Sequence, residues 1–540
     1  MLMMQFEEIN NNEMSVERTK KTKADFLRND QGLVVLGSAK EMAAWVELGL
    51  EEQNKREGPI HPFFMNYIDL SGCELYISYP IGSKTPSSKI FNLCDMAGVV
   101  PGIKKVEGDS NYLFEVKLDV HLDRSILHGN FFHYVKFDGR VCMDNTEVIN
   151  TFSCFKCFFN GPVYMQGIRL KGGFTFEQCE FKKGLIMSKA NVGSINAKFN
   201  NCIINERLSL RDAKFVNRKI ENYKQLIELT NSSVENLSIS GIDTDEIPFI
   251  IDKTSIHGMK MHDMKMEGAL SFCSCDLDGF ITSVMDENKN NNRIKELSIH
   301  CCNIRGQYHL ENTDIDIISL TFDKIEDHGR FRLFQCNVGE LTVGSTSVYG
   351  QMDIIANKIS SMDLEGTCVH GYLQSQDNDV LKYDNRQTIR LLKNEAKKVN
   401  DDVSAIHLYA QEMQMLLEDK DVSCRDKMSL RLSKQFSSFG ENWHKALGMT
   451  LLISLVLTLL MLGLGSGKYM FDPAGDFIGV GPFVTILLDS INVFSIPLFS
   501  DTVNAYDLNV LGQFLYLIIK LIVTYGSYQL VVAFRKYGRN

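Results

Sequence analysis

The chain has 540 residues, a formal net charge of −10 at pH 7 and fourteen cysteines. The acidic balance, with no basic patch interleaved with aromatic residues, argues against nucleic acid as a partner. Residues 1–30 are polar and lack the apolar core of a secretory signal peptide, so we expect a cytoplasmic N-terminus and reduced thiols rather than a disulfide framework.

Residues 1–120 are predicted to form a small α/β cap. Ser38-Ala-Lys-Glu41 has the pattern of a capping box, in which the serine hydroxyl and the glutamate satisfy free backbone amides. It predicts a helix that ends near Gln53. A repeat array needs such a terminal cap, because its first coil would otherwise expose apolar surface.

Residues 121–380 contain a repeated pattern, a small residue followed two positions later by an apolar one. It appears as Cys157-Phe-Phe, Cys179-Glu-Phe and Cys202-Ile-Ile, with spacings of 22 and 23 residues. It returns around Cys275, Cys302, Cys336, Thr346 and Thr367. Alternating apolar positions between Gly or Asn turns are typical of short strands. A period this short, without a helical face, predicts coils of a β-solenoid that stack to share one core.

The small residue of each copy is predicted to point inward, as is the apolar residue two positions later. A reduced cysteine there behaves as a small hydrophobe. These predicted structural anchors are Cys157, Cys179, Cys202, Cys275, Cys302 and Cys336.

Metal binding is the alternative role for the cysteines. Cys154-x-x-Cys157, Cys273-x-Cys275 and Cys301-Cys302 are the candidate ligand pairs. A zinc site needs a second pair at a suitable distance, which the sequence does not offer. We therefore expect packing roles, no metal and no cofactor.

The repeats resemble the pentapeptide-repeat family in Lys189-Ala-Asn-Val192 and Arg211-Asp-Ala-Lys-Phe215. The resemblance implies a right-handed, four-sided β-helix, so the expected fold class is mainly β. The insertions Asn217–Glu228 and Asp286–Arg293 interrupt the pattern and predict an irregular solenoid.

Residues 381–435 change to a helical period and predict a neck. Apolar residues of Thr388–Val399 fall on one helical face, those of Val403–Met413 on the next, and Asn400–Asp402 reads as a turn. The first face comprises Ile389, Leu392, Ala396 and Val399, and the second Ile406, Ala410 and Met413. This pattern predicts an αα-hairpin and resembles a single tetratricopeptide-like unit.

Residues 436–540 predict a membrane domain. Ala446–Leu464 is a charge-free run of 19 residues, and Leu508–Phe534 is an apolar run with one charge, Lys520. A helix needs roughly 20 apolar residues to cross a bilayer. A third apolar stretch, Phe477–Phe499, is broken by glycines, prolines and Asp489.

Basic residues precede the first predicted span and follow the second in the sequence. They are Arg425, Lys427, Arg431, Lys434 and Lys445 before the first span, and Arg535, Lys536 and Arg539 after the second. An excess of Lys and Arg marks the cytoplasmic side. We expect a hairpin with both chain termini in the cytoplasm.

The order of span, broken stretch and span resembles two-helix pore-loop channels. Phe436–Trp443 and Val532–Gly538 also resemble a set of bacterial membrane proteins that join such repeats to membrane hairpins, which implies the bacterial inner membrane. Ionisable residues at membrane depth usually face a protein interior or a water-filled cavity. The pore candidates are Asp489, Ser490, Asn492, Asp501, Lys520 and Thr524. An interfacial position with a snorkelling lysine, or a structural ion pair, are the alternatives.

Two function classes follow, and neither is an enzyme, because phosphate-loop, nucleophile-elbow and zinc-protease motifs are missing from the sequence. In the first, the solenoid senses a cytoplasmic signal and gates a pore formed by a homo-oligomer, as in a stress or anti-phage effector. In the second, the hairpin is a lipid-bilayer anchor and the solenoid is a scaffold for a protein partner.

Overall fold

The computed structural model describes residues 22–56, 67–75, 97, 100, 102–106, 112–128, 130–193, 196–216, 225–283, 292–465, 484, 487–489, 491–492 and 509–534. With 39% of residues in strands, the chain is mainly β, and parallel strands build a β-solenoid of about 11 turns. This confirms the predicted fold class. The chain divides into two units near residues 361–382, which are described separately.

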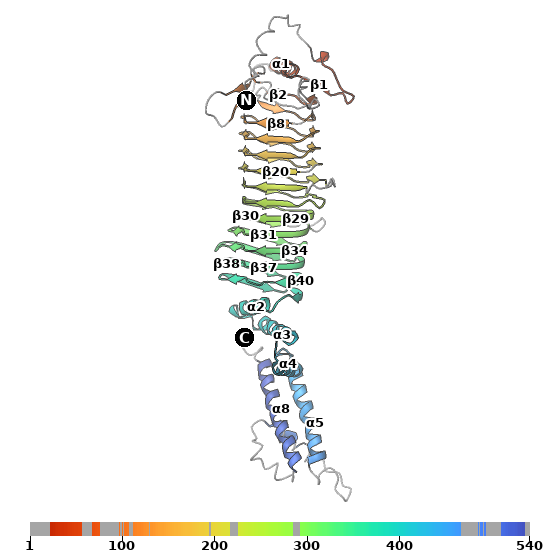
Figure 1. Cartoon of the computed structure of the whole chain (residues 1–540), viewed down its shortest axis with the longest axis vertical. Helices are drawn as coiled ribbons and strands as arrows, with labels where there is room; N and C mark the ends of the chain where they lie inside the picture. The colour runs from red at the N-terminus through yellow and green to blue at the C-terminus, as the bar shows by residue number, and fades with distance from the viewer. Residues whose placement is uncertain are drawn as a thin grey trace. The chain divides into compact units, whose positions relative to one another are not determined.

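The first unit begins with a short cap (Figure 1). It contains the 3-10 helix η1 (Lys23–Asp25), strand β1 (Val34–Leu36) and helix α1 (Ala39–Arg56). The Glu41 amide donates to the Ser38 hydroxyl at 3.2 Å, and the Glu41 carboxylate accepts from the Gly37 amide at 3.0 Å. The predicted helix start is therefore correct, although the glutamate reaches one residue beyond the serine.

Successive coils stack as rungs (Figure 1), so each face of the solenoid is a parallel sheet. One face has twelve strands: β8 (Asn130–His133), β12 (Phe152–Phe155), β16 (Phe174–Glu177), β20 (Asn196–Asn200), β24 (Leu226–Thr230), β27 (Phe249–Asp252), β29 (Lys265–Cys273), β31 (Asn292–His300), β34 (Thr313–Thr321), β37 (Asn337–Gly344), β40 (Lys358–Asp363) and β43 (Asp379–Tyr383). A second face has seven strands: β1, β3 (Cys73–Leu75), β7 (Ile126–Leu127), β11 (Glu147–Val148), β15 (Arg169–Leu170), β19 (Asn191–Val192) and β23 (Lys214–Phe215).

The remaining two faces belong to one sheet. The first column is β5 (Phe114–Val116), β9 (Val135–Phe137), β13 (Phe158–Phe159), β17 (Glu180–Phe181), β21 (Ile203–Ile204) and β25 (Ser233–Val234), with β4 (Ile103–Lys105) antiparallel to β5. The second is β2 (Tyr67–Asp69), β6 (Asp119–His121), β10 (Val141–Cys142), β14 (Val163–Tyr164), β18 (Leu185–Ile186), β22 (Leu208–Ser209) and β26 (Leu237–Ser238). The two columns join in the longer strands β28 (Ser255–Lys260) and β30 (Asp276–Ser283), and separate again after them. The first column continues as β32 (Asn303–Ile304), β35 (Lys324–Ile325), β38 (Ser347–Val348) and β41 (Cys368–Val369). The second continues as β33 (Gln307–Glu311), β36 (Arg330–Phe334), β39 (Gln351–Ile355) and β42 (Tyr372–Gln376).

The cross-section changes halfway along the array. Up to β23 each coil uses four short strands, one on each face. Beyond β23 the seven-stranded face continues as isolated bridges from Lys214 to Asp243 and from Asp243 to Lys265. Lys265 is the first residue of the nine-residue strand β29, which covers two faces and has an irregular register near Met266. The irregular solenoid expected from the sequence thus arises from fused faces.

Tight corners explain the repeated small residue. The residue before each corner adopts a left-handed backbone, as at Gln178, Asn201 and Ser274, with φ between 52° and 54°. The next side chain points inward and donates a hydrogen bond to a carbonyl of the preceding coil. Cys157 Sγ donates to Phe132 O at 3.0 Å, and Thr254 Oγ1 to Leu229 O at 3.1 Å. The corner therefore favours a small side chain with a donor, namely Cys, Ser, Thr or Asn.

All six predicted anchors are buried at such corners, at 0 or 1% exposed. Five of them share one column with Ser232, Thr254 and Thr346. Cys336 stands in a second column with Thr313, Asn357 and Asn378, where Asn357 and Asn378 donate to Leu333 O and Ile354 O. The sequence pattern placed the residues of both columns in a single series of anchors.

The second unit is helical. Its elements are α2 (Arg386–Lys398), α3 (Asp402–Glu418), α4 (Cys424–Ser437), α5 (Trp443–Gly465) and α8 (Val510–Phe534). Asn385 and Asp401 cap α2 and α3 with their side chains, and Ser423 caps α4.

The buried face of α3 agrees with the predicted one only in part. Ala410 is buried as predicted, but Ile406 and Met413 are half-buried, and Ala405, Leu408 and Glu412 are buried instead. The reason is an ion pair that the apolar pattern could not show. The Glu412 carboxylate accepts from Arg390 Nε at 2.6 Å and from Lys393 Nζ, both on α2.

Candidate functional site in the C-terminal hairpin

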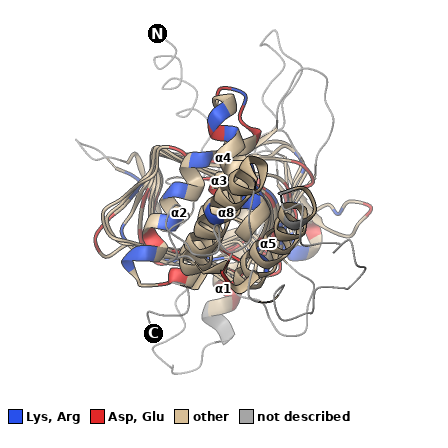
Figure 2. Cartoon of the chain, turned by 90° about the horizontal axis from the view of Figure 1, so that it is seen from below, with Lys and Arg blue, Asp and Glu red and all other residues tan. Residues whose placement is uncertain are grey.

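Helices α5 and α8 are long and apolar enough to cross a membrane. About half of their large apolar side chains are exposed, including Leu452, Val456, Phe514, Leu521 and Val531. Figure 2 shows both ribbons mostly in tan, whereas α4 carries several blue positions. An apolar surface of this extent marks a membrane or protein interface, and it does not fit the buried core helix of a soluble protein.

The two helices pack closely against each other. Met461 on α5 forms a buried cluster with Tyr516, Ile519 and Val523 on α8. A Cβ placed on Gly526 would lie 2.1 Å from Thr450 Oγ1, so only glycine allows the helices this approach.

A stripe of hydroxyl side chains, Thr450, Ser454 and Thr458, is buried along α5. The Thr450 hydroxyl donates to Ala446 O at 2.7 Å, while the Ser454 and Thr458 hydroxyls have no partner among the described residues. Unpartnered hydroxyls are costly in an apolar interior and are compatible with a wet path.

Helix α4 packs against one end of the hairpin formed by α5 and α8. The Ser437 hydroxyl donates to Gln529 Oε1 at 2.7 Å, and both residues are buried. The Phe436 and Tyr525 rings meet edge to face at 5.2 Å. Left-handed backbone at Ser438, Phe439 and Gly440 then reverses the chain into α5. Helix α4 therefore contacts α8 directly.

Lys520 is the one charged residue of α8, and its side chain is turned into the protein. The residue is 5% exposed. Its ammonium donates to the Asp489 carbonyl, and to the Asn492 carbonyl at 2.8 Å. It also lies 5.2 Å from the centre of the Tyr516 ring. The Lys520 ammonium therefore lies in the interior of the second unit.

The segment that receives Lys520 is a helical turn. Leu487–Asp489 and Ile491 are helical, and the Asn492 amide donates to Leu488 O at 3.0 Å. The carbonyls at the C-terminal end of a helix carry a partial negative charge and attract cations. Tyr516 donates its hydroxyl to Asp489 Oδ2 at 2.8 Å. Lys520 thus meets the turn through its carbonyls, and Asp489 is held by the tyrosine.

The structure brings together three of the six pore candidates. Asp489, Asn492 and Lys520 form the cluster, whereas Thr524 is exposed and donates to Lys520 O at 2.7 Å. Ser490 and Asp501 lie outside the described residues. The sequence analysis missed Tyr516, although it stands four residues before Lys520 and so shares its helical face.

Two carbonyl oxygens, a nearby carboxylate and an aromatic ring make an environment suited to a cation. Comparison of the chain with protein-family models, curated proteins and solved structures finds no match.

Proposed function

We propose that the chain is a membrane-bound β-solenoid whose C-terminal hairpins assemble into an oligomeric, cation-conducting pore. One observation carries the proposal: the Lys520 ammonium occupies a cradle of carbonyl oxygens, where a permeating cation would bind. In this conformation the lysine acts as a tethered cation that keeps the path closed. One hairpin has too few helices to enclose water, so the pore is built by a ring of copies.

The cost of a buried charge supports this role. An anchor needs only apolar helices, and a lysine at the middle of α8 makes the free energy of membrane insertion less favourable. An apolar residue would serve an anchor better. A charged side chain that is buried, fully engaged and opposite a broken apolar segment is instead expected in a channel.

The contact between α4 and α8 supplies a route for gating. The Ser437–Gln529 hydrogen bond connects α4 to α8, the helix that carries Lys520. We propose that a cytoplasmic signal acts on the solenoid, moves α4 and withdraws Lys520 from the carbonyls. Opening would depolarise the membrane, as a stress or anti-phage effector requires.

Replacement of Lys520 is expected to increase current. Lys520→Leu removes the tethered charge, which contributes a few kcal/mol to the barrier for a cation at about 4 Å. Reconstituted Lys520→Leu should conduct at least tenfold more than the unchanged chain, and its expression should be more toxic. Leu521→Met, an exposed neighbour on α8, is the matched control. Absence of current from both proteins, with equal growth, would favour a non-conducting anchor.

Orientation is a separate prediction. The basic residues of α4 and of the C-terminus should remain in the cytoplasm, with the segment between the spans reached from outside. A membrane-impermeant thiol reagent added to intact cells should label Lys468→Cys and leave Arg535→Cys unlabelled until the membrane is permeabilised. Labelling of Arg535→Cys from outside would reverse the proposed topology.

A groove in the first unit favours the second candidate function, a membrane-anchored scaffold. It has a volume of about 510 Å³ and combines charged and apolar lining residues, among them Arg293, Asp314, Lys358 and Leu381. Leu381 is 76% exposed, which suits contact with a protein partner. A chain that conducts no ions but binds a protein partner through this groove would be a membrane-anchored scaffold.

A further inference from the structure

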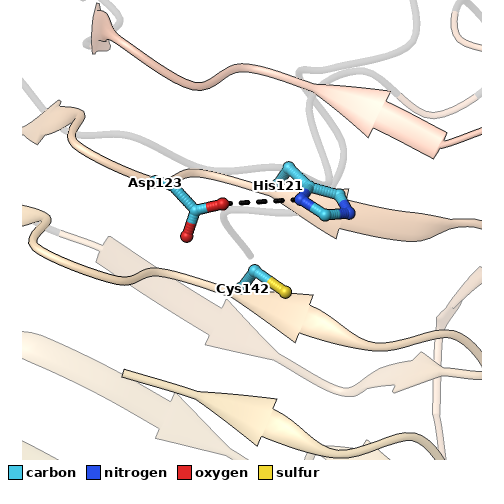
Figure 3. Close-up of side chains that lie close together, drawn as sticks. All are labelled: His121, Asp123 and Cys142. Atoms are coloured by element: carbon cyan, nitrogen blue, oxygen red, sulfur yellow. Dashed lines mark ion pairs between the residues drawn. The ribbon is translucent and has the colours of Figure 1, made fainter. Parts of the chain in front are cut away.

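Two neighbouring coils of the first unit bring a histidine, an aspartate and a cysteine together. His121 ends β6, Asp123 follows two residues later, and Cys142 on β10 pairs with His121 in the sheet. The ligand atoms of the three side chains all lie within 4.8 Å of one another. His121 Nδ1 is 3.4 Å from Asp123 Oδ2, and Cys142 lies on the next coil directly beside them (Figure 3).

Cys142 differs from the anchor cysteines. It is half-buried, and it alternates with the fully buried Val141 along β10, so its side chain lies on the outer side of the coil. The packing argument for the corner cysteines therefore does not explain it.

The surrounding residues hold the other two side chains in place. The Tyr67 ring packs on His121 at 4.6 Å. The Asp144 amide donates to Asp123 Oδ1 at 2.8 Å, which leaves Oδ2 directed at the histidine. Such outer contacts fix the orientation of metal ligands in known sites.

Negative charge gathers around the thiol. The Asp123 carboxylate lies within 4.8 Å of the Cys142 sulfur, and Asp144 follows Cys142 by two residues. Arg140, one of the nearby cations, is paired with Asp119 at 2.6 Å. A bound divalent cation would neutralise this cluster and stabilise the thiolate.

We propose that His121 Nδ1, Asp123 Oδ2 and Cys142 Sγ bind one zinc ion. Nitrogen, oxygen and sulfur donors together suit a borderline-soft metal and disfavour magnesium or calcium. In a tetrahedral site with Zn–N and Zn–O near 2.1 Å, the two ligand atoms lie about 3.4 Å apart, as His121 and Asp123 do. A rotation of the cysteine side chain completes the third bond, and the fourth position is open to water.

Binding exchanges one proton for the metal. The Cys142 S–H bond breaks, the proton passes to solvent water, and the thiolate electron pair forms the Zn–S bond. The ion then links the coil of β6 to the coil of β10 near the cap. This site is independent of the proposed pore.

Cobalt(II) tests the site, because thiolate coordination gives a charge-transfer band. The full chain, purified in detergent, reduced and stripped of metal, is titrated with Co²⁺ and then with Zn²⁺. We expect one Co²⁺ per chain, displacement by Zn²⁺, and a rise in the melting temperature of the solenoid with Zn²⁺. Cys142→Ser should lose the band, and His121→Gln should weaken binding at least tenfold.

Cys273→Ser is the matched control, since Cys273 is also half-buried at the edge of a strand. It should bind Co²⁺ like the unchanged chain. Equal melting of metal-free Cys142→Ser and the metal-free unchanged chain would show that the variant is folded. The proposal is wrong if the unchanged chain shows no thiolate band, or if Cys142→Ser keeps it.

Discussion

Cys202→Arg is expected to unfold the middle coils of the solenoid. Cys202 is fully buried, and its thiol donates to Phe176 O at 3.4 Å and to Asn200 O at 3.5 Å. An arginine there would place an unpaired charge in the core, at a cost of several kcal/mol. Limited proteolysis of the full chain should show new cleavage sites within these coils and a lower unfolding temperature.

Two comparisons separate this cause from a general effect of substitution. Ile203→Arg changes the next residue, which is 48% exposed, and should be close to neutral. Cys202→Ser should cost about 1 kcal/mol or less, because Ser232 and Thr254 fill the same corner in the following coils with a hydroxyl donor. If Cys202→Arg unfolds at the same temperature as Ile203→Arg, the inward anchor is the wrong interpretation.

The free energy of unfolding of the solenoid is expected to fall as pH rises from about 4 to about 7, because of the titration of one buried aspartate. Asp323 occupies a corner position and is 2% exposed. Oδ1 accepts from the Cys302 amide at 2.7 Å, while Oδ2 has no partner among the described residues. Burial raises the pKa of Asp323 to about 7, so the acid keeps its proton where an unfolded aspartate has lost it.

The sign follows from proton binding. The folded chain holds one more proton than the unfolded chain between the two pKa values, so its stability is greatest below pH 4 and declines until pH 7. About three pKa units correspond to roughly 4 kcal/mol. The protonated acid also has the donor that the other corner residues use.

Asp323→Asn should remove this dependence, because the amide is isosteric and always a donor, as at Asn357. At pH 8 the variant should be more stable than the unchanged chain by a few kcal/mol, and at pH 4 the two should be similar. Unfolding midpoints across this range measure the difference. A variant that is less stable at pH 8 would contradict the account of the corner.

The fold was predictable from the sequence where one residue type repeats. The alternation around Cys157, Cys179 and Cys202 predicts coils because each copy buries the same two positions. The fusion of faces at β29 was not predictable, since it depends on whether the chain turns, as it does between Asp243 and β27, or continues as one strand, as it does from Lys265 to Cys273. The two corner columns look alike in sequence because both need a small donor.

The candidate site was predictable only as residues at membrane depth. Lys520 stands out in an apolar helix, but backbone carbonyls carry no signature in sequence, so its partners at Asp489 and Asn492 could not be foreseen. The group of His121, Asp123 and Cys142 was missed because the sheet register aligns residues of two coils, and a search along the chain compares only neighbours.

The mass of the purified full chain in detergent tests the central claim most directly. A pore requires a ring of hairpins, so light scattering corrected for bound detergent should give a single species of several copies of the 61.3 kDa chain. Lys520→Leu should have the same mass, because the proposal assigns this residue to closure of the path. A monomer for both proteins in mild detergent would contradict the pore.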